Sequence, residues 1–300
     1  MSRIIVDVDG LCRSFGGKVA LDRVDFRATE GRVYGLVGSN GAGKTTLIRH
    51  LLGLLRAESG KVRVFGFDPV RDPVRVLSRI GYLSEDRDMP EWMRIGELMA
   101  YTRAFHPGWD EAYANELIGT FGLDLSTRIK ELSKGTRAQA GLVAAVAHRP
   151  ELLILDEPST GLDPVVRRDI LDAIVRAVAD DGRTVIFSSH LLEEVERMSD
   201  HITMIHDGRV MLSGEIEDVR RHYRRSRVRF ADYFEAPPRL DNAFSFEGGG
   251  RTWSVIHGGP FDEFRASVVS LGGEVVDSRD ATLEEIFLAR AGRHEPLEAA

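Results

Sequence analysis

The sequence predicts an α/β fold with a largely parallel sheet, followed by a smaller α+β region. Continuous apolar runs at Val33–Val37, Leu152–Leu155 and Thr184–Phe187 are typical of strands that are buried on both faces. Helix-like segments alternate with these runs, and such alternation indicates parallel strands with helices on both faces. A chain of 300 residues is long enough for about two domains.

Two half-exposed strands precede the first buried run. Ile4–Asp9 and Val19–Phe26 alternate polar and apolar residues, which predicts an antiparallel sheet with one exposed face. After the first buried strand, a glycine-rich turn leads into Lys44–Leu55, whose apolar residues have helical spacing. Val62–Phe65 and Ile80–Leu83 are predicted to be further strands.

The stretch from Pro90 to Thr127 is predicted to be a helical insertion in this α/β core. Helices are expected at Ile95–Phe105 and Glu111–Phe121, separated by a Pro-Gly turn. Further helices at Val165–Ala179 and Leu191–Met198 alternate with the later buried strands.

The sequence pattern changes after about Arg220, from buried strands alternating with helices to a basic run and short segments, and this change predicts a second domain. The run Arg220–Arg225 is basic, and we expect it to be a solvated linker. The predicted division is therefore 1–220 and 221–300, and the first domain contains a helical subdomain at about 88–133. In the second domain we expect strands and helices at Val228–Ala231, Trp253–Ile256, Phe261–Leu271, Glu274–Asp277 and Leu283–Ala291, and fraying at Glu295–Ala300.

Composition excludes several classes of protein. A net charge of −7 argues against a chain whose main task is to grip nucleic acid. The single cysteine, Cys12, rules out a disulfide within the chain and indicates a reducing compartment. Charge-free runs such as Val33–Gly43 have about half of the roughly 20 residues that a transmembrane helix needs. The first residues also lack the pattern of a secretory signal, so we expect a cytoplasmic chain.

Residues 38–46 fit the phosphate-binding pattern G-x-x-x-x-G-K-[ST], between a predicted strand and a predicted helix. The glycines let successive amides point at phosphate oxygens, and the helix adds its positive N-terminal end. Lys44 would neutralise the β- and γ-phosphates, and the Thr45 hydroxyl would ligate Mg²⁺. We therefore assign nucleotide contacts to Gly38, Ser39, Asn40, Gly41, Ala42, Gly43, Lys44, Thr45 and Thr46.

Two carboxylates, Asp156 and Glu157, follow the buried strand Leu152–Leu155. In open α/β sheets, ligands bind beyond the C-terminal ends of the strands. We expect Asp156 to hold Mg²⁺ and Glu157 to activate the attacking water as a general base. Together with the phosphate loop, this pair predicts a site of nucleotide hydrolysis.

Three further stretches complete a family pattern: Leu132–Thr136 before a helix, Ser159–Asp163 after the acidic pair, and His190 after a buried strand. In this order and spacing, the chain resembles the ATP-binding cassette (ABC) family of nucleotide-binding domains over about residues 3–220. The stretch Ala281–Leu288 resembles the tail of ATPase subunits in drug- and antibiotic-exporter-type ABC transporters. The resemblance implies a P-loop NTPase core with an antiparallel β subdomain and a helical insertion.

The resemblance also implies roles for further residues. Ser133 and the Gly135 amide would contact the γ-phosphate of ATP held by a second cassette, and Ser133 is equally suited to cap its helix. His190 would sense the γ-phosphate and orient the attacking water. Asp163 would lie in the loop that links the two sites of a dimer. Phe15 would stack on adenine, and the alternative for Phe15 is an ordinary core position.

Two parts of the chain depart from the family pattern. Glu85 stands where the family usually has glutamine; it would still reach Mg²⁺, but it adds negative charge beside Asp156 and Glu157. In the signature stretch, Lys134 and Thr136 replace the usual glycine and glutamine. Lys134 would either point at solvent or help to neutralise the triphosphate.

The resemblance implies an ATP-binding and ATP-hydrolysing subunit that powers a separate integral-membrane permease, and the expected direction of transport is export. Two cassettes, most simply a homodimer, would sandwich two ATP–Mg²⁺, and the helical insertion would dock the permease with Glu85 at the hinge. The chain would then lie at the inner face of the cell membrane. Two alternatives are a soluble ABC-type ATPase acting on ribosomes or nucleic acid, which only the run Arg220–Arg225 favours, and a regulator that binds nucleotide without useful hydrolysis, suggested by Glu85 and Lys134. We expect no nucleic-acid partner.

Overall fold

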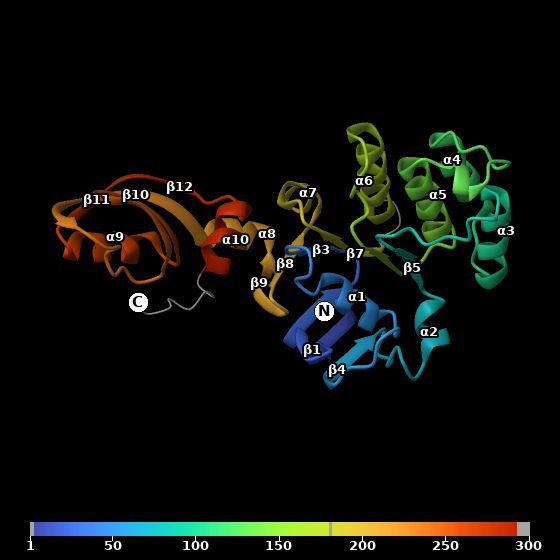
Figure 1. The fold of residues 1–300 in the computed structure, drawn as a ribbon, viewed down its shortest axis with the longest axis horizontal. Coiled ribbons are helices and arrows are strands. Elements are labelled where there is room, and N and C mark those ends of the chain that lie inside the picture. The colour runs from blue at the N-terminus through green and yellow to red at the C-terminus, as the bar shows by residue number, and fades with distance from the viewer. Residues whose placement is uncertain (1–2, 180–181, 293–300) are drawn as a thin grey trace. The chain divides into compact units, whose positions relative to one another are not determined.

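The computed structural model describes residues 3–179 and 182–292, which form two compact units, Met1–Leu212 and Ser213–Ala300 (Figure 1). Within the described residues, no helix has both the length and the apolar character needed to cross a membrane. The expected fraying of Glu295–Ala300 lies outside the described residues. The functional division at residue 220 stays a prediction.

A six-stranded sheet forms the centre of the larger unit. Its strands are β3 (Val33–Val37), β5 (Ile80–Leu83), β6 (Leu152–Leu155), β7 (Thr184–Ser189), β8 (His201–His206) and β9 (Arg209–Glu215). They lie in the order β5-β6-β7-β3-β8-β9, and the first four neighbouring pairs are parallel. Every residue of β3, β6 and β7 is buried, as their apolar runs predict. The loops that follow these strands therefore meet at one edge of the sheet.

A smaller antiparallel sheet belongs to the same unit. Its strands are β1 (Ile4–Phe15), β2 (Lys18–Thr29) and β4 (Ser59–Val64), in the order β2-β1-β4. The helix α1 (Lys44–Leu51) packs against β2 and β4, and apolar side chains of both sheets and α1 form one core. The helix is shorter than the apolar spacing predicts, because Gly53 adopts a φ of 70° and turns the chain.

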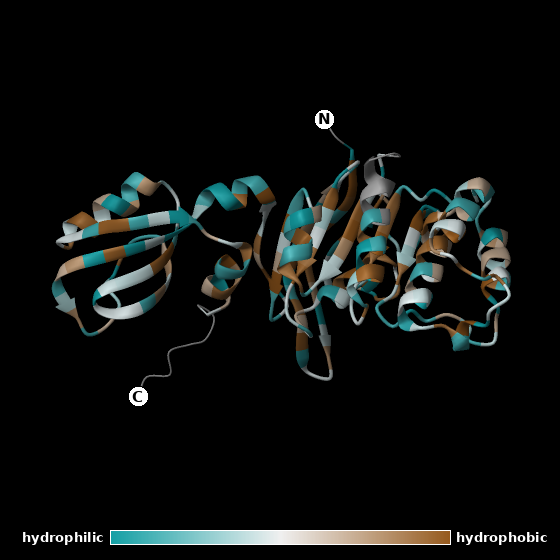
Figure 2. Cartoon of the chain, turned by 90° about the horizontal axis from the view of Figure 1, so that it is seen from above, coloured by the Kyte–Doolittle hydropathy of each residue, from teal (hydrophilic) through white to brown (hydrophobic). Residues whose placement is uncertain are grey.

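The other helices of the larger unit are α2 (Pro73–Leu77), α3 (Ile95–Phe105), α4 (Glu111–Thr120), α5 (Lys134–Val146), α6 (Pro164–Ala179) and α7 (Leu192–Met198). The predicted helical insertion consists of α3, α4 and a short 3₁₀ turn at Ile129–Glu131. Both helices pack against α5, which in turn packs against β5 and α6 (Figure 1). Hydrophobic residues concentrate in the strands of the six-stranded sheet (Figure 2).

The smaller unit has its own sheet and core. Its elements are α8 (Ile216–His222), β10 (Tyr223–Phe234), β11 (Ala243–Gly258), α9 (Phe261–Ser270), β12 (Gly273–Asp280) and α10 (Leu283–Ala291). The strands form an antiparallel sheet in the order β11-β10-β12, and α9 packs against β12. Buried apolar side chains such as Phe230, Trp253 and Phe264 fill the core between them.

The basic run Arg220–Arg225 is not a linker, so this expectation is wrong. It ends α8 and begins β10, where the strand ladder fixes its backbone. Arg224 forms an ion pair with Asp280 at 3.3 Å, and Arg225 contacts Glu285 at 2.6 Å. Ion pairs with β12 and α10 thus neutralise charge that the sequence alone places in solvent.

Candidate functional site

The phosphate loop runs from the end of β3 to the first turn of α1. Gly43 directly precedes α1 with a φ of 115°, a conformation that strains other residues. A Cβ atom at Gly38 would lie only 2.3 Å from the carbonyl oxygen of Ile205 on β8. Backbone conformation at one end and close packing at the other therefore both require glycine.

Lys44 is buried at the N-terminus of α1, with 5% of its surface exposed. Its Nζ donates to the Gly38 carbonyl at 2.7 Å and to the Ser39 carbonyl at 3.3 Å. The same atom lies 3.0 Å from Glu157 Oε1. The ammonium adds to the positive end of the helix, and this combination favours an anionic ligand such as phosphate.

The acidic pair lies where β6 ends, and both side chains are buried. Ser188 on β7 joins the two residues. Its Oγ donates to Asp156 Oδ1 at 2.6 Å and accepts from the Glu157 amide at 2.8 Å. The other oxygen, Asp156 Oδ2, is buried and has no hydrogen-bond partner among the described residues. A buried carboxylate oxygen without a partner is costly unless a cation neutralises it, so Asp156 is a candidate metal ligand.

Three side chains hold the carboxylate of Glu157. Its Oε2 accepts from Thr160 Oγ1 at 2.9 Å and lies 2.8 Å from His190 Nδ1, while Oε1 faces Lys44. The backbone of Glu157 has a φ of 48°, which is rare for a residue other than glycine. Such a conformation persists only where the surroundings enforce it, and it is frequent at functional sites.

Burial and neighbouring charges set the ionisation of these carboxyl groups. Burial raises the pKa of Asp156, partly offset by the hydrogen bond from Ser188. Burial also raises the pKa of Glu157, but the hydrogen bond with His190 and the charge of Lys44 outweigh it, so this pKa lies below its usual value. Partial burial and the charges of Asp156 and Glu157 raise the pKa of Glu85. Glu157 is thus kept ionised, as a proton acceptor must be.

A pocket of about 280 Å³ brings together much of the predicted site. It is lined by Ser39, Asn40, Gly41, Gly43, Lys44, Thr45, Thr46, Glu85 and Glu157. Asp156 lies in an adjoining groove, whose lining also includes Thr45 and Glu85. The loop, the acidic strand end and the segment after β5 thus meet around one space.

Phe15, Ser133 and Gly135 lie outside the lining of this pocket. Phe15 is 44% exposed, and the guanidinium of Arg13 lies 4.7 Å from its ring centroid, so it is not a core residue. Ser133 caps α5 by accepting from the Thr136 amide at 3.1 Å. Gly135 is buried in the first turn of α5. The nucleotide contacts assigned to these three residues stay predictions.

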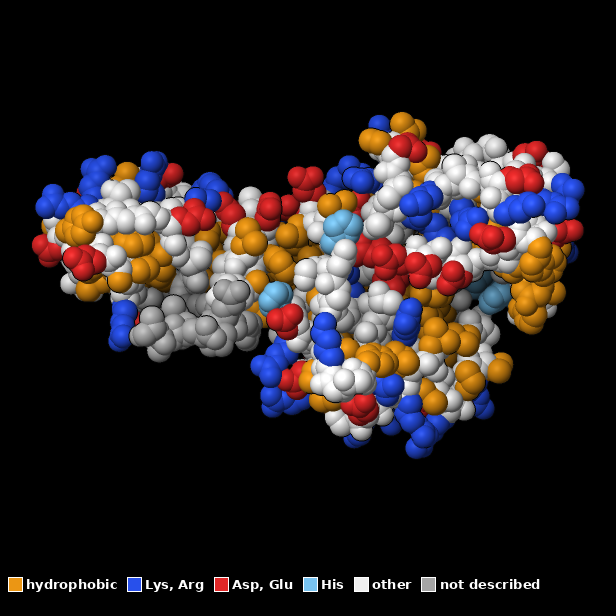
Figure 3. Space-filling model, viewed as in Figure 1, with side chains coloured by type: hydrophobic (Ala, Val, Ile, Leu, Met, Phe, Trp, Pro, Cys, Tyr) orange, Lys and Arg blue, Asp and Glu red, His pale blue; other side chains and the backbone are white. Residues whose placement is uncertain are grey.

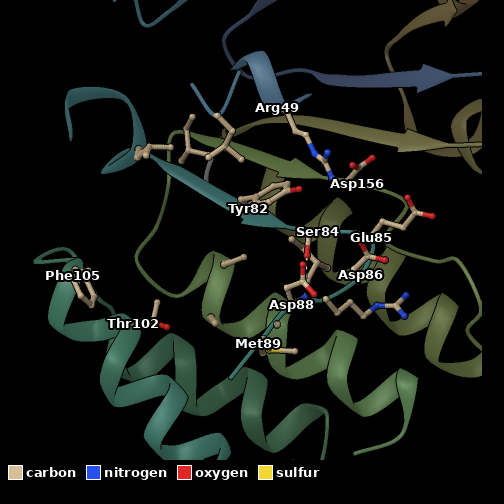
Figure 4. A pocket seen from close by; sticks show the side chains of 18 of the residues that line it. Arg49, Tyr82, Ser84, Glu85, Asp86, Asp88, Met89, Thr102, Phe105 and Asp156 are labelled. Atoms are coloured by element: carbon tan, nitrogen blue, oxygen red, sulfur yellow. Dashed lines mark hydrogen bonds between the residues drawn. The ribbon is translucent and has the colours of Figure 1, made fainter. Parts of the chain in front are cut away.

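A groove of about 940 Å³ opens beside the pocket, between α2 on one side and α3 on the other (Figure 4). Apolar side chains on its walls include Leu54, Val74, Leu77, Leu98 and Phe105. Figure 4 shows Glu85, Asp86 and Asp88 on one rim, near Asp156 and Tyr82. Figure 3 shows acidic side chains gathered on this face of the larger unit, next to a hollow bordered by hydrophobic ones. The groove is thus apolar along its walls and acidic towards the phosphate pocket.

Sequence analysis did not identify three residues that hold the acidic strand end: Arg87, Thr160 and Ser188. Arg87 Nη2 donates to the carbonyl oxygens of Pro158 and Thr160, at 3.3 and 2.9 Å. No local motif reveals this contact, because the two segments are far apart in the sequence. The sequence position of Ser188 weakly indicates a buried hydrogen bond, since a hydroxyl at the end of a buried strand needs a polar partner.

Comparison with known proteins identifies the family. Residues 21–160 match the family described as ABC transporter. The daunorubicin resistance ATP-binding protein DrrA3 of Streptomyces coeruleorubidus is 37% identical over 225 residues, which cover 73% of this chain and 71% of DrrA3. The chain belongs to the ABC transporter family.

Two further similarities extend this result. The ABC transporter ATP-binding protein YtrB of Bacillus subtilis (strain 168) is 28% identical, over 96% of this chain and 98% of YtrB. A solved structure of an ATP-binding subunit of an ABC transporter is 29% identical, with a TM-score of 0.67, and covers 72% of this chain and 92% of its own. The predicted family, the fold class and the function as an ATP-binding, ATP-hydrolysing transporter subunit are therefore confirmed. Among the solved structures with the same fold, one cassette is described as dimeric and another as part of an ABC transporter complex.

Proposed function

We propose that this ABC protein binds ATP with Mg²⁺ at the phosphate loop, hydrolyses it with Glu157 as general base, and powers a separate exporter-type permease. The observation that carries the site assignment is the cluster around the loop. Lys44 Nζ lies 3.0 Å from Glu157 Oε1, and His190 Nδ1 lies 2.8 Å from Glu157 Oε2. These contacts support the proposed roles of Lys44 as the cation for phosphate, Glu157 as the proton acceptor and His190 as a hydrogen-bonding imidazole.

The donor set beside the loop fits Mg²⁺. Oxygen ligands suit this hard cation. Thr45 and Asp156 line the same groove, and Asp156 Oδ2 has no hydrogen-bond partner among the described residues. Glu85 reaches the same space from the segment after β5. When bound, Mg²⁺ would neutralise charge on the phosphate oxygens.

The hydrolytic step uses side chains that are already ordered. Glu157 would accept a proton from the attacking water as the water oxygen bonds to the γ-phosphorus. The bond from this phosphorus to the β–γ bridging oxygen breaks at the same time, and ADP leaves with that oxygen. The hydrogen bond from Thr160 and the contact with His190 fix the direction of the carboxylate, and Lys44 would balance the charge on the phosphates. His190 is partly exposed, so its ring can also contact the γ-phosphate.

A second copy of the chain would complete the site. Ser133 and Gly135 begin α5, whose N-terminus carries the partial positive charge that attracts phosphate. Asp163 caps the start of α6 by accepting from the amides of Val165 and Val166, which holds the connecting loop in a fixed shape. We propose a homodimer in which each Ser133 meets the γ-phosphate bound by the other copy.

The groove between α2 and α3 is the proposed docking surface for the permease. Exposed apolar side chains on the helical insertion support this role: Trp92 is 70% exposed and Phe105 is 64% exposed. Such residues beside an apolar groove are typical of a protein interface. Because Glu85 borders both the groove and the phosphate pocket, its segment would couple docking to the nucleotide.

The similarity to DrrA3, a resistance protein by name, supports transport out of the cell. The chain would act at the inner face of the cell membrane, held there by its permease. We assign the smaller unit to support of the dimer or to regulation. The ion pairs of Arg224 and Arg225 remove most of the support for a nucleic-acid partner.

Steady-state ATPase measurements on Glu157→Gln test this proposal. The substitution keeps the shape of the side chain and removes its basicity, so we expect turnover to fall about a hundredfold or more. ATP binding should be retained, because Lys44 and the loop are unchanged. Turnover equal to that of the wild type would refute the general-base assignment.

A further inference from the structure

Arg87 is a buried arginine in the segment that joins β5 to α3. It is only 7% exposed, whereas Glu85, Asp86 and Asp88 beside it are exposed. Its backbone has a φ of 50°, and burial lowers the pKa of its guanidinium. A buried cation at such a position is stable only where specific acceptors hold it.

The acceptors of Arg87 belong to the turn that directly follows Glu157. Arg87 Nη2 donates to the carbonyl oxygen of Pro158 at 3.3 Å and to that of Thr160 at 2.9 Å. Thr160 in turn donates its hydroxyl to Glu157 Oε2 at 2.9 Å and its amide to the Glu157 carbonyl at 3.2 Å. A short series of hydrogen bonds therefore leads from Arg87 to the carboxylate.

The other end of this series lies at the groove. The Arg87 amide donates to the Ser84 carbonyl at 3.1 Å, and the Asp88 amide donates to Ser84 Oγ at 3.2 Å, so the segment forms a tight turn. Glu85 and Met89 line the groove (Figure 4), and Arg87 belongs to the same lining. Displacement of this turn would therefore move the guanidinium that holds the Pro158–Thr160 turn.

We propose that Arg87 is a positioning residue, which fixes the turn after Glu157 and so orients the carboxylate for activation of water. Because Arg87 also lines the groove, it ties the orientation of Glu157 to the shape of the docking surface. This inference rests on the proposed role of Glu157 as general base. It predicts an effect on kcat and little effect on the affinity for ATP.

Steady-state ATPase kinetics of the full chain test the proposal. In Arg87→Met, which keeps length and burial but removes the donors, we expect kcat to fall by about ten- to a hundredfold, since a displacement of 1 Å costs up to about that much. The KM for ATP should change by less than about threefold. Arg87→Lys, which keeps the charge and one donor, should recover part of kcat.

Arg183→Met is the matched control. Arg183 is also buried, at 4% exposure, but its guanidinium lies over the Tyr113 ring at 5.5 Å. If both variants lose the same fraction of kcat, the effect is a general loss of stability and the proposal is wrong. If Arg87→Met does not fold, Arg87→Lys is the deciding variant. A wild-type kcat in Arg87→Lys, together with loss of the hydrogen bonds to residues 158 and 160, would overturn the positioning role of Arg87.

The Glu157→Gln background separates this proposal from the proposed function. Single-turnover rates in Glu157→Gln should fall less than about twofold further on adding Arg87→Met, because Arg87 acts through Glu157. A full additional loss would overturn the positioning role. Wild-type turnover in Glu157→Gln alone would overturn the general base, whereas an inactive Glu157→Gln beside a fully active Arg87→Met would overturn only the role of Arg87.

Discussion

The hydroxyl oxygen of Ser188 forms a hydrogen bond with each of the two acidic residues. Its removal therefore tests the geometry of the site. Ser188 is fully buried at 0% exposure. In Ser188→Ala, the Asp156 carboxylate loses a 2.6 Å donor and the Glu157 amide loses a 2.8 Å acceptor. Each buried polar group left unpaired costs about 1–3 kcal/mol, so the expected loss of stability is about 2–6 kcal/mol.

Hydrogen exchange of the β6 and β7 amides is the assay, because the two units of the chain need not unfold together. The opening free energy of these strands should fall by the stated amount, and ATP turnover should fall with it. Thr120→Ala is the control, since Thr120 is exposed and its hydroxyl donates to the Glu116 carbonyl of its own helix. Its effect should stay within about 0.5 kcal/mol. If the β6 and β7 amides are as well protected from exchange in Ser188→Ala as in the control variant, Ser188 does not hold the acidic pair.

Two further predictions concern nucleotide affinity and pH. Phe15→Ala should raise the KM for ATP about tenfold, because stacking of an aromatic ring on a base contributes about 1–3 kcal/mol. Phe15→Trp keeps an aromatic ring and should leave this KM unchanged. An unchanged KM in the alanine variant would exclude Phe15 from the adenine site. The larger unit should lose stability as pH falls from about 6.5 to about 4, because burial lowers the pKa of His148 from 6.5 to about 4 and the unfolded chain then binds more protons. His148→Phe should flatten this part of a thermal-unfolding profile against pH, and an unaltered slope would contradict the assignment.

The parts of the site that could be predicted from sequence are those formed by a single short segment of the chain. Residues 38–46 form a turn between a strand and a helix, and the chemistry of Gly43 and Lys44 depends on that local geometry. Asp156 and Glu157 follow β6 directly, so the end of a buried strand fixes their place. The fold class followed in the same way from the buried runs of β3, β6 and β7.

The parts that could not be predicted depend on contacts between distant segments. Arg87 reads as an ordinary charged residue in an acidic loop, and only the packing of that loop against the Pro158–Thr160 turn buries it. The sequence pattern of Arg220–Arg225 is that of a solvated linker, because the acidic partners of Arg224 and Arg225 lie on β12 and α10, which are distant in the sequence. The spacing of apolar residues also predicts a first helix, Lys44–Leu55, that is longer than α1. This spacing carries no information on the left-handed conformation of Gly53, which turns the chain.

In the proposed dimer, Ser133 of a second copy completes the site in which ATP is bound at Lys44. The most direct test is the molar mass of Glu157→Gln in solution, by light scattering, with and without ATP and Mg²⁺. We expect the mass to double with ATP–Mg²⁺ and to stay that of one chain when Ser133→Arg is added, although ATP still binds. A single-chain mass in Glu157→Gln with ATP bound would contradict it.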